Sequence, residues 1–258
     1  VEIQFADYIF PAYDQIVNEM AKVRHRSGGE FWCPVTIRTP AGGGIRGGHH
    51  HSQSPEAQFT HTPGLKVVYC STPYNAKGLL ISAIEDNDPV IFFEPKRCYR
   101  GPFYGDPHNV PTWSGHPEAE VPESHYSIPL GEARLAMEGD RCTVISWGAM
   151  VHVCEQAIRD SGISCDLIDL QTLVPWDREA VVTSIEKTGR CVIVHEAPKT
   201  SGFGAEMAAS IQERCFWSLE SPIERVTGWD TPFPHTTEWD YMPGPDRVAA
   251  AIAKTQEE

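Results

Sequence analysis

The stretch PVIFFEP at residues 89–95 constrains the fold more than any other, because it is apolar at nearly every position. A strand with one face in water alternates apolar and polar residues, whereas a strand of a parallel sheet is buried on both faces. Two further strand-like stretches, PVTIR at 34–38 and LKVVYCS at 65–71, precede it, with helical patterns in between. This alternation predicts an α/β protein with a parallel sheet that is covered by helices on both faces.

The first half contains further elements of the same kind. VEIQF at residues 1–5 is strand-like, and the apolar residues after it recur at helical spacing until Gly28 and Gly29, a pair typical of a helix end. We expect a strand at 1–5 and a long helix after it. Apolar residues again recur at helical spacing at residues 54–64 and 73–88, where two more helices are expected.

The second half repeats the alternation of strands and helices. Four apolar, strand-like stretches occur at residues 143–148, 164–170, 191–197 and 223–229. Helical patterns follow them at residues 151–162, 178–189, 204–216 and 246–256. Four strands joined by three right-handed crossovers predict a doubly wound domain. We therefore expect two doubly wound domains, at residues 1–100 and 130–258, joined by a proline-rich linker at residues 101–129.

Composition argues against several classes of function. Lys and Arg number 21 against 35 Asp and Glu, a net charge of −14, which argues against nucleic-acid binding because phosphates attract clustered basic residues. No apolar run reaches the roughly 20 residues of a membrane-spanning helix, and no signal peptide is visible. The eight cysteines stand singly, mostly in apolar runs, which predicts buried free thiols in a reducing compartment.

The tract GGGIRGGHHH at residues 42–51 is the most unusual local feature. Its glycine spacing matches neither a P-loop nor a dinucleotide fingerprint, so a close backbone approach to a ligand or another subunit is favoured over phosphate binding. Neighbouring residues of an extended segment point to opposite sides, so the three histidines cannot all face one metal. The sequence contains no G-x-S-x-G motif, so it does not indicate a nucleophilic serine of the hydrolase type. From these residues alone, His51 is a structural, an interface or a catalytic histidine.

Several stretches occur in an order that is typical of one family, among them IQFADYIFPAYDQIVNEMAK, HSQSPEA, EDNDPVIFFEPKRCYR, KTGRCVIVHEA and ERVTGWDTPFPH. Together they resemble the β subunits of the decarboxylating component of branched-chain 2-oxo-acid dehydrogenases, within the transketolase-like thiamine-diphosphate superfamily. The resemblance runs essentially from Val1 to the C-terminus. It implies a partial transketolase-like pyrimidine-binding domain followed by a transketolase C-terminal-like domain.

The resemblance assigns roles to three residues. In the family, thiamine diphosphate lies between an α and a β subunit; the α subunit holds the diphosphate through magnesium, and the β subunit holds the aminopyrimidine. Tyr8 matches the tyrosine that lines the pyrimidine, and Gln4 matches another position close to the site. His51 matches the histidine that assists transfer of the acyl group to lipoyl. An activating glutamate of the superfamily lies upstream of the residues that match VEIQF, so we expect the chain to be N-terminally truncated.

The β subunits of the family also carry a structural potassium site. Backbone carbonyls and one carboxylate, which suit a hard cation, form most of it. The matching positions are Cys33, Val35, Thr36, Ala83, Asp86 and Asp88. Two departures put potassium in doubt: Pro34 changes the loop, and Asp88 replaces an asparagine of the animal members. The alternative is an ordinary helix C-terminus with solvated acids.

The resemblance thus implies the activity of 3-methyl-2-oxobutanoate dehydrogenase (2-methylpropanoyl-transferring). That activity is the oxidative decarboxylation of branched-chain 2-oxo acids such as 2-oxoisovalerate, with reductive acylation of lipoyl groups. The implied partners are an α subunit, in an α2β2 heterotetramer, and a lipoyl-bearing dihydrolipoyl acyltransferase, in the bacterial cytoplasm or the mitochondrial matrix. Two alternatives stay open: a β subunit of pyruvate or acetoin dehydrogenase, and a non-catalytic fragment whose acidic second domain docks the acyltransferase.

Overall fold

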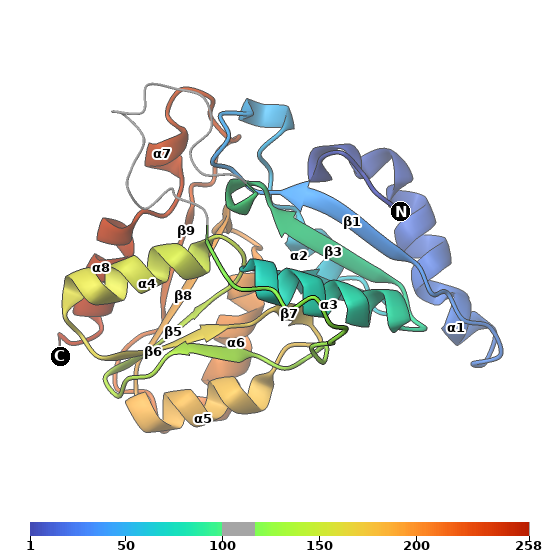
Figure 1. Ribbon diagram of the computed structural model, residues 1–258. Helices are drawn as coiled ribbons and strands as arrows, with labels where there is room; N and C mark the ends of the chain where they lie inside the picture. Colours follow the sequence, from blue (N-terminus) through green and yellow to red (C-terminus); the bar gives the residue numbers. More distant parts are fainter. Residues whose placement is uncertain (100–116, 258) are drawn as a thin grey trace.

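The computed structural model describes residues 1–99 and 117–257, and it contains two sheets (Figure 1). The first sheet has the order β1 (Thr36–Ala41), β3 (Val90–Pro95), β2 (Lys66–Tyr69) and β7 (Thr172–Val174). Strands β1, β3 and β2 are parallel, and every residue of β3 is buried. The prediction from the apolar stretch at 89–95 is therefore confirmed.

Helices of the first half begin and end at residues that suit helix termini. Helix α3 (Pro73–Glu85) starts after Thr72, whose side chain accepts a hydrogen bond from the Asn75 amide in a capping box. The shorter α2 (Glu56–Thr60) follows the histidine tract. Both correspond to expected helices, although α2 is shorter than the pattern at 54–64 suggested.

The N-terminal segment departs from the expected strand and regular helix. VEIQF forms only a single bridge between Glu2 and Arg38, because a 3-10 turn at Ala6–Tyr8 begins directly after it and leaves no length for a ladder. The long helix is present but irregular: a 3-10 turn (Phe10–Ala12) is followed by a π-helical turn (Gln15–Glu19), a second 3-10 turn and α1 (Val23–Arg26). Apolar spacing predicts which face is buried but not which backbone hydrogen bonds form.

The second sheet contains the four predicted strands and one more. Its order is β4 (Arg134–Met137), β6 (Cys165–Asp169), β5 (Cys142–Ser146), β8 (Cys191–Pro198) and β9 (Glu224–Gly228). Strands β6, β5, β8 and β9 are parallel. The unexpected strand β4 pairs antiparallel at the edge. It is only four residues long, and its residues are exposed or partly buried, unlike those of the predicted strands.

Four helices cover the second sheet. Helices α4 (Met150–Ser161) and α8 (Pro245–Lys254) pack together on one face, and α5 (Arg178–Thr188) and α6 (Phe203–Cys215) on the other (Figure 1). Gly162 and Gly189 end α4 and α5 in the left-handed conformation, which confirms the helix ends expected at these glycines. No helix within residues 1–99 and 117–257 combines the length and apolar character that a membrane crossing needs.

Strand β7 comes from the second half of the chain but belongs to the first sheet. It pairs antiparallel with β2, with Val174 opposite Val67. The sequence contains no separate signal for it, because no glycine or proline in LIDLQTLVP separates β7 from the strand before it. Residues 101–116 of the expected linker lie outside the described residues, and 117–129 contain no helix or strand. The boundaries 1–100, 101–129 and 130–258 stay a prediction.

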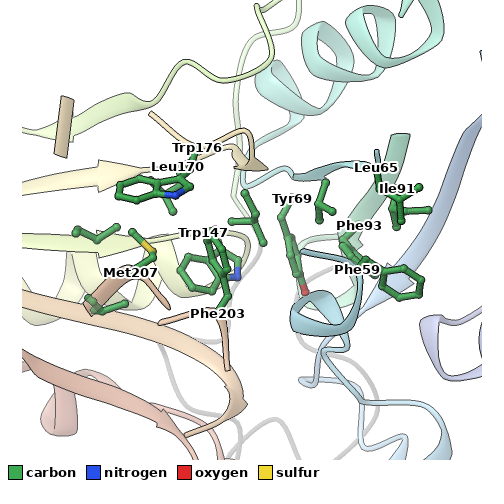
Figure 2. Close-up of a cluster of buried hydrophobic side chains, with 14 of the residues drawn as sticks. Phe59, Leu65, Tyr69, Ile91, Phe93, Trp147, Leu170, Trp176, Phe203 and Met207 are labelled. Carbon is green, nitrogen blue, oxygen red and sulfur yellow. The ribbon is translucent and has the colours of Figure 1, made fainter. Parts of the chain in front are cut away.

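The largest cluster of buried hydrophobic side chains runs through both halves. Tyr69 and Phe93 of the first sheet belong to the same buried cluster as Trp147 and Phe203 of the second half. In Figure 2, Tyr69 lies between Phe93 on one side and Trp147 and Phe203 on the other. Because the core is continuous, the two halves are held at a fixed relative position, and side chains from both can form one site.

Asp169 connects the two sheets with polar contacts. Its carboxylate, at the end of β6, is fully buried and accepts hydrogen bonds from the Ser71 hydroxyl at 2.5 Å, the Asn75 amide at 3.3 Å and the Arg134 guanidinium at 3.2 Å. Burial raises the pKa of Asp169, and the positive charge of Arg134 and these hydrogen bonds work against that rise.

Asp169→Ala is therefore expected to lower the free energy of unfolding by about 1–3 kcal/mol, because Ser71 and Asn75 lose a buried acceptor. Urea denaturation followed by circular dichroism measures this. The exposed Asp140 provides a matched control, since Asp140→Ala removes an equivalent group without buried partners. Equal midpoints for the two variants would show that Asp169 does not join the sheets energetically.

Candidate functional site

The segment Gly42–Gln53, here called the glycine loop, follows β1 and carries the three histidines. Its ends are joined by a hydrogen bond from the Gly42 amide to the Gln53 carbonyl at 2.9 Å. Gly42 and Gly44 have φ of 84° and 92°, a backbone region that other residues rarely adopt. The glycines are thus required by the backbone path of the loop.

Two carboxylates from the second half accept hydrogen bonds from backbone amides of the glycine loop. Glu196, at the end of β8, accepts the Gly43 amide at 2.8 Å. Glu238, the first residue of α7 (Glu238–Tyr241), accepts the amides of Gly44 at 3.1 Å and Arg46 at 3.0 Å. Successive backbone amides of this kind form an anion-binding site. Here glutamates of the protein itself fill it, so these amides do not cradle a phosphate.

Close packing explains why a side chain is not tolerated in this part of the loop. A Cβ atom on Gly43 would lie 2.6 Å from the Phe233 ring, and one on Gly44 would lie 2.8 Å from Cβ of Arg97. The close backbone approach expected from the sequence therefore exists, but it is made within the same chain, to Phe233 of the second half and Arg97 of the first. In Figure 1 the loop and α7 lie at the same end of the molecule.

Several ionisable side chains are buried under the glycine loop. Burial raises the pKa of Glu56 to about 8 and that of Glu238 to about 7, and it also raises the pKa of Glu196. Burial lowers the pKa of Lys96 to about 8, while the nearby carboxylates of Asp7, Glu196 and Glu238 oppose that change. Ionisable groups with pKa values shifted in this way are frequent at functional sites.

The structure separates His51 from its two neighbours. His49 and His50 are exposed, whereas His51 is half-buried and its Nε2 lies 2.8 Å from the Tyr8 hydroxyl. The ring of Phe5 meets the His51 ring edge to face, with centroids 4.9 Å apart. Tyr8 itself is 45% exposed. The two residues that the resemblance selected independently, Tyr8 and His51, are thus in direct contact.

Gln4 lies just before this cluster. It is exposed, and its amide makes no hydrogen bond to the part of the chain that the structure describes. The sequence interpretation missed the groups that hold the loop, namely Lys96, Glu56, Glu196 and Glu238. The segment at 191–197 ends at the carboxyl edge of a strand, where ligands of α/β sheets lie, and this was the available signal for Glu196.

The residues of the expected potassium site do come together. The Thr36 hydroxyl donates to the Ala83 carbonyl at 2.8 Å, and the Cys33 amide donates to the Asn87 carbonyl at 3.1 Å. However, Lys66 lies 2.5 Å from the Asp86 carboxylate and Arg24 lies 2.9 Å from that of Asp88.

Protein cations therefore already neutralise both acids, and this donor set does not fit a metal cation as it stands. The Val35 carbonyl is also occupied, since it accepts the Val90 amide at 3.0 Å. Potassium binding at Cys33, Val35, Thr36, Ala83, Asp86 and Asp88 stays a prediction of the resemblance, and no chemical step is derived from it.

Comparison with known proteins first defines the class. The family model of the transketolase pyrimidine-binding domain matches residues 1–102, and that of the transketolase C-terminal domain matches residues 131–248. A solved structure described as a split-gene transketolase, inactive β4 tetramer, has a TM-score of 0.73 at 20% identity and covers 98% of this chain, which in turn spans 74% of that structure. The chain thus has a transketolase-like fold with two domains.

The 2-oxoisovalerate dehydrogenase subunit beta of Pseudomonas aeruginosa is 55% identical over the whole chain, which spans 74% of that protein. A pyruvate dehydrogenase E1 component subunit beta of Acholeplasma laidlawii is 42% identical, over 98% of this chain and 74% of that protein. The chain belongs to the family of 2-oxoisovalerate dehydrogenase β subunits, as its resemblance indicated.

The pKa of Glu56 leads to a prediction about stability. A carboxyl group whose pKa is higher in the folded than in the unfolded protein stabilises the fold below its ordinary pKa of 4.5, and this stabilisation is lost as the pH rises to about 8. In Glu56→Gln the side chain cannot ionise, so this loss of stability with rising pH does not occur. We expect the free energy of unfolding of the variant, minus that of the wild type, to be about 1–3 kcal/mol higher at pH 8 than at pH 5.

Urea denaturation of both proteins at pH 5, 6.5 and 8 measures this difference. Glu213→Gln, on the exposed face of α6, is the matched control and should leave the pH dependence unchanged. Parallel pH curves for Glu56→Gln and the wild type would contradict the assignment of a buried, protonated Glu56.

Proposed function

We propose that this chain is the β subunit of a thiamine-diphosphate-dependent 2-oxo-acid dehydrogenase that decarboxylates branched-chain 2-oxo acids such as 2-oxoisovalerate. The activity is that of 3-methyl-2-oxobutanoate dehydrogenase (2-methylpropanoyl-transferring). The observation that carries the proposal is the contact between Tyr8 and His51, at 2.8 Å, in a chain of this family. Two motifs separated by 43 residues supply one aromatic and one acid–base group to the same place.

The exposed aromatic surface fits the aminopyrimidine of thiamine diphosphate. Tyr8 is half-exposed beside Phe5, and a planar heterocycle packs well against such rings. Gln4, exposed on the same segment, offers an amide that can bond a ring nitrogen or an amino group. When bound, the cofactor supplies the nucleophilic carbon and the electron sink for decarboxylation. The resemblance assigns the diphosphate and its magnesium to the α subunit.

His51 is proposed to act in acyl transfer to lipoyl. That step needs a group that gives a proton to a departing sulfur atom, and an imidazole can do so near neutral pH. The Tyr8 hydroxyl at His51 Nε2 and the Phe5 ring fix the orientation of this imidazole. A fixed orientation matters because proton transfer requires hydrogen-bonding distance.

The partners follow from the family. An α subunit completes the site in an α2β2 heterotetramer, and a lipoyl-bearing dihydrolipoyl acyltransferase receives the acyl group. The proposed location is the bacterial cytoplasm or the mitochondrial matrix, because the relatives include a bacterial protein and one named as mitochondrial. Docking of the acyltransferase on the acidic second domain is compatible with this function.

Pyruvate or acetoin dehydrogenase is the second candidate, because a pyruvate relative is 42% identical over 98% of the chain. The higher identity to the 2-oxoisovalerate relative, 55%, favours the branched-chain substrate. Initial rates of the reconstituted complex with each 2-oxo acid decide between them. A higher kcat/KM for pyruvate than for 2-oxoisovalerate would overturn the branched-chain assignment.

His51→Ala is expected to slow reductive acylation of a free lipoyl domain about 100-fold, because the proton donor is lost. Decarboxylation measured with an artificial electron acceptor should change much less, since it does not use this proton. The α–β complex is made from the complete reading frame of the gene. His50→Ala, which removes an exposed neighbour, should leave both rates near the wild-type values. Equal losses in the two assays for His51→Ala would refute the role.

A further inference from the structure

Lys96 is a buried cation with few partners of its own. It follows β3, and its side chain is only 3% exposed. Within residues 1–99 and 117–257 its ammonium group has no hydrogen-bond partner. Two groups of the N-terminal segment lie close to it: the Asp7 carboxylate at 3.9 Å and the Phe5 ring, 4.9 Å from the ring centroid. A buried charge without hydrogen bonds is costly, so its presence requires an explanation.

The two residues that Lys96 contacts both reach the glycine loop. Phe5 packs against the His51 ring at 4.9 Å. The other oxygen of the Asp7 carboxylate accepts the backbone amide of Gln53 at 3.3 Å, two residues beyond His51. Two series of contacts thus connect the ammonium group with the glycine loop: one through the Phe5 ring to His51, and one through the Asp7 carboxylate to Gln53.

We propose that Lys96 is a positioning residue for His51, acting through Phe5 and Asp7. The positive charge attracts the Asp7 carboxylate and the face of the Phe5 ring, and so holds both against the loop. Tyr8, which directly follows Asp7 in sequence, is then placed to hydrogen-bond His51. The proposal rests on the role proposed above for His51 in acyl transfer.

The charge of Lys96 depends on its surroundings. The carboxylates that face it are Asp7, Glu196 and Glu238, and Arg97 is its neighbour in sequence. Burial lowers the pKa of Lys96 to about 8 against the effect of these carboxylates. Above pH 8 the ammonium group therefore loses its proton, and its attraction for Asp7 and Phe5 disappears.

Lys96→Met removes the charge but keeps a long side chain. In the assembled α–β complex we expect reductive acylation to fall about 10-fold, because a displaced proton donor loses its alignment. Decarboxylation with the artificial acceptor should fall less than reductive acylation, because it does not use the proton that His51 donates. We expect wild-type reductive acylation to decline above pH 8, where Lys96 loses its proton, and this decline should be weaker in the variant. Lys187→Met, which breaks a lysine–aspartate pair with the buried Asp166, is the matched control and should affect neither rate selectively.

A second readout does not depend on activity. Diethyl pyrocarbonate acylates accessible imidazoles, and peptide mapping by mass spectrometry gives the rate at His51 relative to the exposed His49 and His50. In Lys96→Met we expect the relative rate at His51 to rise about 3-fold or more, as its contacts with Phe5 and Tyr8 loosen. An unchanged relative rate, with both half-reactions reduced equally, would overturn the proposal.

Two further variants complete the test. Lys96→Arg retains the charge and should restore the low reactivity of His51 where Lys96→Met does not. If Lys96→Met fails to assemble, Asp7→Asn weakens the same attraction with minimal change of shape and should raise the reactivity of His51; no rise would overturn the proposal. If the role proposed for His51 is wrong, His51→Ala will not lose reductive acylation selectively. The reactivity of His51 towards diethyl pyrocarbonate will still rise in Lys96→Met, so the two proposals can fail separately.

Discussion

The hydrogen bonds from the backbone of the glycine loop to Glu196 and Glu238 are the interaction on which the rest of the site depends. They join the first half of the chain to the second, and they fix the segment that carries His51. Charged acceptors form stronger bonds with amides than neutral ones do, so three such bonds hold the loop firmly. The active geometry is therefore a property of both halves of the chain, although the residues proposed to touch the cofactor all belong to the first.

This arrangement concentrates ionisable groups where water is scarce. Glu56, Glu196 and Glu238 each have a raised pKa because of burial, and Lys96 has a lowered one. Burying a charge is unfavourable unless an opposite charge or a hydrogen bond compensates it. For Glu196, the Gly43 amide and the positive charges of Arg97 and Lys96 oppose the effect of burial. The site is thus held together by groups whose charge states depend on one another.

Sequence patterns predicted the parts of the fold that are governed by burial. The apolar strands at 89–95 and 191–197 are buried along almost their whole length, and Gly162 and Gly189 end their helices as expected. Strand β7 was missed because pairing with a distant strand, and not local periodicity, makes it a strand. Likewise, the motifs pointed to Tyr8 and His51, but nothing local in the sequence indicates that Glu238, 194 residues beyond Gly44, holds the same loop.

The three adjacent histidines illustrate why a motif alone does not define a functional residue. His49, His50 and His51 have the same side chain and nearly the same position, yet only His51 turns towards Phe5 and Tyr8. The difference arises because the short helical turn Gly48–His50 ends immediately before His51, where the backbone changes direction. The turn is possible because Gly48 has φ of 64° and packs against His235 of the second half. The second half of the chain thus takes part in selecting which histidine faces the site.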